Sequence, residues 1–211
     1  MKHFFEACYR SPLGRIMSFF ARTYASLYKP FMVYGYFDQA SKTFQKYTRI
    51  SSTAIIMNQH SLTIGDHVWV GQYCILDATE GLFIEEGVQI ASRASIFTHG
   101  SQNSIRLLGN QFVHISHKDR QGYTRGAVKI GKYSFIGTAS IVLPGVTIGK
   151  GCLIGANTLV NRDVPDYSIF IGSPGEIRGS TIDLDRTYFK SQDFSDTYYD
   201  KEALNSLKSA L

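Results

Sequence analysis

The segment IGKYSFIGTASIVLPGVTIGKGCLIG, from Ile130 to Gly155, places an aliphatic residue at every sixth position. The series comprises Ile130, Ile136, Val142, Ile148 and Ile154, and Val160 continues it. A helix repeats every 3.6 residues and a strand every 2, so a period of six indicates neither element on its own.

A second inward position lies two residues before each aliphatic residue, and a glycine often follows the aliphatic residue. These second positions hold Val128, Ser134, Ser140, Val146, Cys152 and Thr158. The hexad therefore predicts a short strand with two inward side chains, followed by a tight turn. Three such units make a triangular coil of about 18 residues whose parallel strands stack roughly 4.8 Å apart. The hexads leave no room for the helices of an ordinary βαβ protein.

The same six-residue period occurs upstream, between residues 64 and 96, and is then interrupted. Hexad positions hold Ile64, Val70, Leu76, Ile84, Ile90 and Ile96. The phase slips by two residues at 78–81, which predicts a small bulge at a corner, and Ile50 and Ile56 predict an irregular first coil. The hexads stop at Phe97 and resume at Val128. A loop of that length in a compact protein is typically functional or disordered.

Composition limits the function classes. The chain has 211 residues, enough for one domain with appendages. A net charge of +5 suits an anionic ligand but is too weak to indicate nucleic acid, and no aromatic RNA-binding motif occurs. The odd number of cysteines, 3, favours a reducing cytoplasm over a disulfide framework. No stretch is apolar enough to span a membrane, and charges interrupt any signal-peptide core.

From Val128 to Arg178 the sequence resembles the hexapeptide-repeat acyltransferases, especially sugar O-acetyltransferases of the maltose and galactoside type. The segment LPGVTIGKGCLIGANTLVNRDVPDYSIFIGSPGEIRG resembles the family's C-terminal signature, and LTIGDHVWVG and IFTHGS match earlier parts. The resemblance implies an all-β fold, a left-handed parallel β-helix. That hand opposes the usual right-handed crossover, so it rests on the resemblance and not on the hexads.

His99 opens the interrupting loop, and the family's catalytic histidine follows the same coil. The resemblance therefore implies that His99 is the general base. An imidazole suits this task, because a sugar hydroxyl must lose its proton as it attacks a thioester. The negative charge that develops on the carbonyl needs fixed donors such as backbone N–H groups. We expect direct transfer in a ternary complex, without a covalent enzyme intermediate.

The resemblance also implies a coenzyme A site along the C-terminal coils, between neighbouring subunits. The pantetheine arm would pass Gly137, Thr138 and Ala156, where small residues permit close approach. Tight corners alone would explain the same small residues. Phe135 stands where the family has a tryptophan.

Two arginines would meet the nucleotide phosphates. Arg162 stands where the family often has a lysine, and its alternative interpretation is a solvated corner charge. Glu176 stands where the family usually has a basic residue, and it would repel a phosphate. The contacts with the nucleotide phosphates would therefore come from Arg162, Arg178 or a neighbouring subunit.

The acceptor residues are less well defined by the resemblance. An asparagine of the galactoside enzymes falls near Gly71, with Gln72 next to it, so we expect an acceptor other than a simple galactoside or maltose. Asp77 matches a family aspartate near the acceptor, although aspartate at a bulged corner is also a common turn residue. Asn103, in the interrupting loop, completes the predicted acceptor residues.

The other histidines have simpler interpretations. His114 and His117 lie three residues apart in the loop, and with His99 they could form a three-histidine zinc site. Their spacing does not match the β-helical carbonic anhydrases, so we expect no metal and instead one acceptor-lining histidine or two solvated ones. His60 and His67 lie at coil corners and are expected at the surface.

The chain ends fall outside the hexads. Ser11 and Pro12 predict a helix start, and an apolar stripe follows. Residues 1–30 carry five Lys/Arg and one Glu, so this helix is either a cap over the first coil, which we favour, or a contact with an anionic membrane. DKEALNSLKSAL predicts a short final helix. The expected regions are 1–49, a β-helix at 50–180 with the loop at 99–127, and a tail at 181–211.

Together these observations predict a cytoplasmic homotrimer that uses acetyl-CoA to O-acetylate a sugar of a bacterial surface polysaccharide, such as lipopolysaccharide or capsule. Peripheral contact with the inner membrane would involve the N-terminal helix. One alternative is an N-acetyltransferase that acts on a nucleotide-linked amino sugar, although the leader is too short for a separate nucleotide-binding domain. Another is a non-catalytic β-helical scaffold, against which His99 at the start of a polar loop argues.

Overall fold

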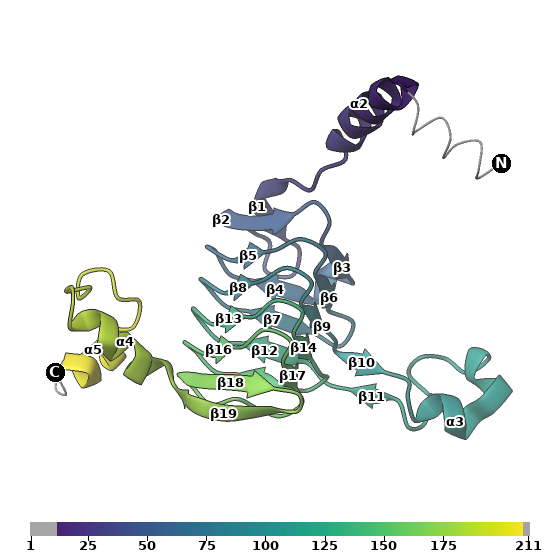
Figure 1. Ribbon diagram of the computed structural model, residues 1–211. Coiled ribbons are helices and arrows are strands. Elements are labelled where there is room, and N and C mark those ends of the chain that lie inside the picture. Colours follow the sequence, from purple (N-terminus) through teal and green to yellow (C-terminus); the bar gives the residue numbers. More distant parts are fainter. Residues whose placement is uncertain (1–11, 209–211) are drawn as a thin grey trace. The chain divides into compact units, whose positions relative to one another are not determined.

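The computed structural model describes residues 12–208 and divides into two units, Met1–Phe31 and Met32–Leu211. The first unit holds α2 (Pro12–Ser26), which confirms a helix in the leader, while the predicted N-cap Ser11 lies outside the described residues (Figure 1). Phe19, Phe20 and Tyr24 are exposed on this helix. Among residues 12–208, no helix combines the length and apolarity that a bilayer crossing needs. The cap and membrane-contact alternatives both stay predictions.

Three sheets of mostly parallel strands make up the centre of the second unit, and the chain passes through them in rotation (Figure 1). We call residues 43–172 the three-sheet stack. The segment between Phe97 and Val128, where the hexads stop, is called the arm. Before the arm the strands of the stack are β2 (Thr43–Ser51), β3 (Ile55–Met57), β4 (Leu62–Ile64), β5 (Trp69–Val70), β6 (Ile75–Asp77), β7 (Leu82–Ile84), β8 (Gln89–Ile90) and β9 (Ser95–Ile96). After the arm they are β12 (Val128–Ile130), β13 (Phe135–Ile136), β14 (Ile141–Val142), β15 (Thr147–Ile148), β16 (Leu153–Ile154), β17 (Leu159–Val160) and β18 (Ser168–Gly172).

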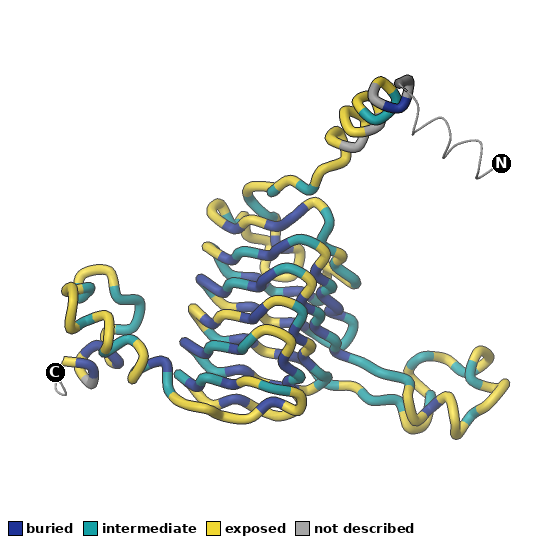
Figure 2. The backbone as a smooth tube through the Cα atoms, in the orientation of Figure 1, coloured by how far each residue is buried: buried dark blue, intermediate teal, exposed yellow. Residues whose placement is uncertain are grey.

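The register places the hexad aliphatic residues in columns. Ile136 of β13 lies opposite Ile90 of β8 on one side and Ile154 of β16 on the other, and none of the three is exposed. Figure 2 shows the resulting alternation of buried and outward residues along each sheet. Burial of each such side chain contributes about 1.5–3 kcal/mol. Parallel strands at hexad spacing are therefore confirmed, and the left-handed sense of the coil stays an expectation.

Hydroxyl groups inside the stack hydrogen-bond to the backbone of the next turn. Ser134 Oγ donates to the Gly149 carbonyl at 2.7 Å and accepts from the Cys152 N–H at 3.0 Å. Ser140 Oγ donates to the Gly155 carbonyl at 2.7 Å. Because a buried hydroxyl without a partner is costly, these contacts explain why serine is tolerated at inward hexad positions.

Two different residues at each of these corners meet two different requirements, close approach to the next turn and a left-handed backbone conformation. A Cβ on Gly137 would lie 2.5 Å from the Ala156 nitrogen of the next turn, so this glycine is needed for close approach. The left-handed backbone falls two residues later, on Ala139 (φ 59°). The same pairing occurs at Gly131 and Tyr133 (φ 55°). At other corners a glycine adopts this conformation, as at Gly87 (φ 72°) and Gly151 (φ 62°), so the left-handed corner position accepts glycine and non-glycine residues alike.

A hairpin precedes the predicted start of the stack. β1 (Met32–Asp38) pairs antiparallel with β2, which in turn pairs in parallel with β5 through Arg49 and Trp69. Asp38 holds the hairpin against the stack, because its Oδ2 accepts the Ile64 N–H at 2.9 Å. The stack therefore begins at Thr43, earlier than the first irregular coil that was expected near residue 50. The 310 helix η1 (Gln59–Ser61) connects β3 to β4.

The interruption of the hexads is an arm rather than an irregular loop. β10 (His99–Gly100) pairs antiparallel with β11 (Thr124–Arg125), and α3 (Ser104–Leu108) and the 310 helix η2 (Gly109–Val113) lie between them (Figure 1). At the other end, β18 pairs antiparallel with β19 (Gly175–Ser180), and α4 (Thr181–Phe189) and α5 (Lys201–Lys208) follow. The predicted final helix is confirmed as α5.

Truncating one column residue tests the stacked core. We expect Ile136→Ala to lower the free energy of unfolding by about 2–5 kcal/mol, because it leaves a cavity between Ile90 and Ile154. Ile55→Ala makes the same change at a side chain that is 56% exposed, and it should cost less than about 1 kcal/mol. Denaturant unfolding of both variants is the measurement. Equal losses would contradict the assignment of Ile136 to the core.

Candidate active site

A carboxylate and an imidazole meet where the arm leaves the stack. Asp77 ends β6, and β6 pairs with β9, whose continuation reaches His99 at the start of β10. Asp77 Oδ2 lies 2.7 Å from His99 Nδ1. The Asp77 side chain is fully buried, whereas that of His99 is 25% exposed, so the imidazole reaches solvent and its partner does not.

Four hydrogen bonds keep Asp77 ionised. Its Oδ2 accepts from the Thr98 N–H and hydroxyl, both at 2.9 Å. Its Oδ1 accepts from the Thr79 N–H at 3.0 Å and from the Thr79 hydroxyl at 2.5 Å. Burial acts to raise the pKa of Asp77, but these donors outweigh it and the pKa is lowered. Asp77 is therefore an anion at neutral pH.

The anion determines which imidazole nitrogen can act as a base. His99 Nδ1 is buried and has no other hydrogen-bond partner in the described part of the chain. Because a carboxylate only accepts hydrogen bonds, the proton of neutral His99 belongs on Nδ1, beside Asp77. Nε2 then carries the lone pair. This arrangement can take a proton from a hydroxyl or amine and stabilise the imidazolium that forms.

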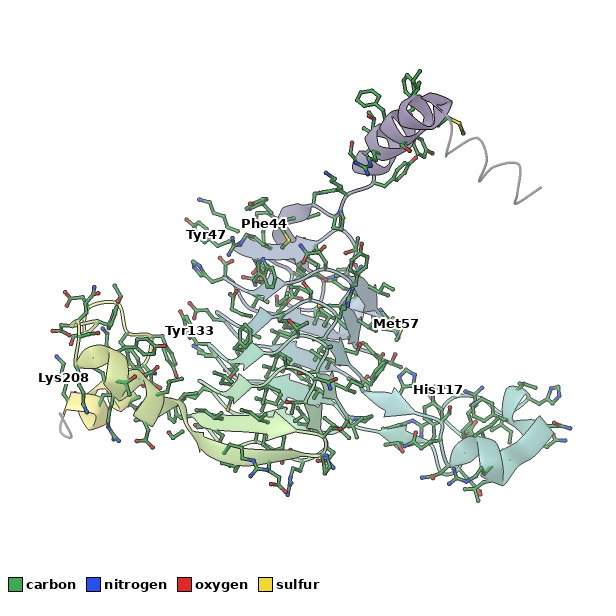
Figure 3. The ribbon with its side chains drawn as sticks, in the orientation of Figure 1. Phe44, Tyr47, Met57, His117, Tyr133 and Lys208 are labelled. Carbon is green, nitrogen blue, oxygen red and sulfur yellow. The ribbon has the colours of Figure 1, made fainter. Side chains whose placement is uncertain are left out.

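Aromatic side chains of the arm surround His99. The Tyr123 ring is nearly parallel to His99, with 9° between planes and 5.7 Å between centroids. His117, which Figure 3 labels on the arm, stands edge-on to both rings, at 5.7 Å from His99 and 4.6 Å from Tyr123. Of the two loop histidines, His117 therefore lies beside the candidate base. His114 is exposed, and the ring contacts of His99 in residues 12–208 are with His117 and Tyr123 instead.

An ion pair continues this cluster. Glu80 Oε1 lies 3.3 Å from Arg125 Nε and 3.9 Å from His117 Nδ1. Arg125 also covers the Tyr123 ring, with its guanidinium carbon 4.7 Å from the ring centroid. The Glu80 N–H donates to Thr98 Oγ1 at 3.0 Å, which ties this acid to the same threonine that holds Asp77. Sequence reasoning missed Glu80, Tyr123 and Arg125. The β10–β11 pairing brings Tyr123 and Arg125 to His99, whereas Glu80 comes from the turn between β6 and β7.

The other predicted acceptor residues have local partners. Gln72 Oε1 accepts from the Ser92 hydroxyl at 2.7 Å. Asn103 is exposed on the arm, where its Oδ1 accepts from Arg106 Nη2 at 2.6 Å. In the described residues neither makes a polar contact with His99, so the structure joins Asp77 to the base but not Gln72 or Asn103.

Three of the predicted coenzyme A residues meet at one corner. Gly137 and Thr138 follow β13, and the Thr138 carbonyl accepts the Asn157 N–H at 2.8 Å, which brings Ala156 onto the adjacent turn. Thr138 and Ala156 are both exposed. Phe135 is 44% exposed on the preceding strand.

The two predicted phosphate-binding arginines lie instead near the β18–β19 hairpin. Arg162 Nη2 donates to the Gly175 carbonyl at 2.8 Å and borders a cavity of about 290 Å³ with Glu176. Arg178 Nη2 lies 2.9 Å from Glu176 Oε2. Glu176 thus faces the arginines that the sequence assigned to phosphates. His60 and His67 are exposed, as expected.

Within residues 12–208, no three histidine, cysteine, aspartate or glutamate side chains are grouped as a metal site. The rings of His99 and His117 are nearly perpendicular, with 80° between their planes. Asp77 contacts His99 and Glu80 contacts His117, so the two histidines do not share a carboxylate.

Comparison with known proteins identifies the repeat. Residues 127–162 match the family described as bacterial transferase hexapeptide (six repeats). A probable acetyltransferase of Mycobacterium tuberculosis is 31% identical over 122 residues, which are 57% of this chain and 37% of that protein. The chain therefore spans little more than a third of that relative. A dTDP-4-amino-4,6-dideoxy-D-glucose acyltransferase of Escherichia coli is 26% identical over 160 residues, covering 66% of this chain and 82% of that protein.

Solved structures share the fold. A galactoside acetyltransferase in complex with coenzyme A is 20% identical with a TM-score of 0.50, covering 63% of this chain and 62% of the other. An N-acyltransferase from Bacillus cereus, in complex with dTDP and 3-hydroxybutyryl-CoA, is 24% identical with a TM-score of 0.50, covering 69% and 88%. The repeat in residues 127–162 and these named relatives confirm that the chain resembles the hexapeptide-repeat acyltransferases, as the sequence predicts.

Proposed function

We propose that this protein is a left-handed β-helical acetyltransferase that transfers acetyl from acetyl-CoA to a sugar hydroxyl. The buried Asp77–His99 pair carries the proposal, because it supplies an oriented base at the surface of a rigid stack. The match of residues 127–162 to bacterial transferases supports the reaction class. The biosynthesis of a bacterial surface polysaccharide in the cytoplasm, at or near the inner membrane, is the setting that we infer for this reaction.

His99 is the general base in the proposed reaction. As the sugar oxygen attacks the thioester carbonyl, its proton passes to Nε2, and the Asp77 anion stabilises the imidazolium. The C–S bond then breaks, and the proton returns from Nε2 to the leaving thiolate. No covalent enzyme intermediate is needed. Backbone N–H groups would stabilise the oxyanion of the tetrahedral intermediate.

The arm provides the acceptor site in this proposal. Tyr123 offers a ring face beside His99, and Glu80 offers a partly exposed carboxylate that can accept hydrogen bonds from hydroxyl groups. Arg125 and His117 belong to the same cluster, because both contact Glu80 and the Tyr123 ring. This mixture of an aromatic face and polar groups suits a saccharide, with Gln72 and Asn103 as outer contacts for a longer glycan.

An amine acceptor is the second candidate. The Escherichia coli relative is named for a dTDP-linked amino sugar, and the chain covers 82% of its length. The same Asp77–His99 pair would then deprotonate the ammonium group or the attacking amine. Incubation of candidate glycans and nucleotide-linked amino sugars with acetyl-CoA, followed by mass spectrometry, distinguishes an ester from an amide product. A non-catalytic scaffold would give neither product.

Substitution of the dyad tests the mechanism. We expect His99→Ala to lower kcat by about 10²- to 10⁴-fold, because the base is lost while the stack stays folded. Asp77→Asn should lower kcat by more than about tenfold, because an amide donor beside Nδ1 favours the wrong tautomer. Steady-state kinetics are the measurement, with thermal unfolding to verify the fold.

His114→Ala is the matched control, since it removes an exposed arm histidine that is not among the ring contacts of His99. It should retain near wild-type activity, and a chelator should leave the enzyme active. Near wild-type turnover by His99→Ala would refute the mechanism, and loss of activity on chelation would restore the zinc alternative.

The proposed donor site runs along the corner of Gly137, Thr138 and Ala156, with Phe135 at its edge and Arg162 and Arg178 toward the nucleotide. Ala156→Trp should abolish coenzyme A binding, because the new ring fills the exposed corner beside Thr138. Arg162→Ala should weaken coenzyme A more than dephospho-coenzyme A if Arg162 meets the 3′-phosphate. Calorimetric titration of both ligands is the measurement, and equal losses would remove Arg162 from that role.

The donor site would be completed by a neighbouring subunit of a homotrimer. Outward apolar side chains on the sheet faces support such assembly, since Phe83, Phe135 and Ile141 are each at least 40% exposed. We expect light scattering to give a trimeric mass at micromolar concentration. A monomeric mass would contradict both the assembly and the shared site.

A further inference from the structure

A second cavity, of about 380 Å³, lies between the stack and the C-terminal tail. Its main walls are Tyr133, Asp185, Phe189, Phe194, Tyr198 and Tyr199. Tyr133 comes from a corner of the stack, and Figure 3 labels it there, while the other residues come from the tail after β19. The volume falls in the range of small-molecule pockets, roughly 300–1,000 Å³. None of these residues belongs to the site around His99.

The aromatic rings are inclined to one another and line a cavity that is partly open to solvent. Tyr133 and Tyr199 have centroids 4.7 Å apart at 33°, and Tyr199 and Tyr198 are 5.1 Å apart at 40°. Phe189 stands nearly perpendicular to Tyr198, at 74° and 5.5 Å. The rings therefore do not share one plane, and they line the cavity from different directions.

Specific contacts anchor the tail that supplies these walls. Lys150 Nζ lies 2.7 Å from Asp200 Oδ2, and the Tyr167 hydroxyl donates to the same carboxylate. The Tyr199 hydroxyl lies 2.0 Å from the position that a Cβ on Gly151 would take, and the Tyr133 ring lies 2.5 Å from the Cβ position of Gly87. Tyr199 and Tyr133 therefore pack directly against Gly151 and Gly87, two corners of the stack, and these contacts fix two walls of the cavity.

One carboxylate in the cavity has no cationic partner. Asp185 accepts a hydrogen bond from the Tyr198 hydroxyl at 2.7 Å, and it forms no ion pair within the described residues. The nearby ammonium of Lys150 is engaged by Asp200, whose hydrogen bond holds the pKa of this lysine above its usual range. Arg186, the neighbour of Asp185 in α4, contacts Asp183 instead. The cavity thus joins aromatic faces to a carboxylate that lacks a counter-ion.

We propose that this cavity is a binding site for an organic ammonium cation. Aromatic faces attract a cation through the ring quadrupole, and rings at several inclinations can contact it from different sides. Asp185 supplies the opposing charge at close range. The ammonium group can belong to a small quaternary amine or to an amino sugar. The site is independent of the acetyl-transfer reaction at His99.

Two matched pairs of probes test the charge requirement. Choline and its neutral isostere 3,3-dimethylbutan-1-ol have the same shape, and glucosamine and glucose differ only at one amino group. We expect choline or glucosamine to bind at least about tenfold more tightly than its neutral counterpart, as measured by ligand-observed NMR titration of the full-length protein. Tighter binding of choline than of glucosamine would identify a quaternary amine as the ligand class, and the reverse order would identify an amino sugar.

Asp185→Asn should reduce cation binding by about tenfold or more and leave acetyl transfer unchanged. Asp183→Asn is the control, since it removes a carboxylate from the same helix that does not line the cavity, and it should bind as the wild type does. Phe189→Ala should also weaken binding of the cation. Equal binding of the charged and neutral probes, preference for glucose, or no binding of any probe would each overturn the proposal.

Discussion

Close contact between neighbouring turns at the corners is the constraint on which the rest of the structure depends. At Gly131 and Gly137 an added Cβ would lie 2.5 Å from the backbone of the next turn. This spacing lets the parallel strands form hydrogen bonds and places the buried columns in direct contact. It also fixes one turn relative to the next so firmly that a functional group on one turn can be held by a group on its neighbour.

The hexads were sufficient to predict the parallel strands because each inward position in them is aliphatic, a small hydroxyl residue or a cysteine. Ile90, Ile136 and Ile154 show this column directly. The β1–β2 hairpin was not predicted, since most of its residues are exposed or half-buried and follow no period of six. The left-handed corner residues were missed as well, because Tyr133 and Ala139 carry no glycine-like signal.

The candidate site was predictable residue by residue, but its geometry was not. His99 and Asp77 were each selected through the family resemblance, whereas their 2.7 Å contact depends on the register of β6 with β9. Tyr123 and Arg125 reach the site only because the arm folds back through β10 and β11. The arm has no hydrophobic period from which that pairing could be predicted.

Burial of Asp77 explains how the stack and the arm can have separate roles. A buried carboxylate is stable only when donors replace its lost hydration, and Thr79 and Thr98 provide those donors from the stack. The orientation of His99 is therefore set by rigid strands and costs little conformational entropy on substrate binding. Tyr123 and His117 belong to the arm, so their identity can change without disturbing the base. In the proposed function, such a fold keeps the Asp77–His99 pair on the stack while the arm selects the acceptor.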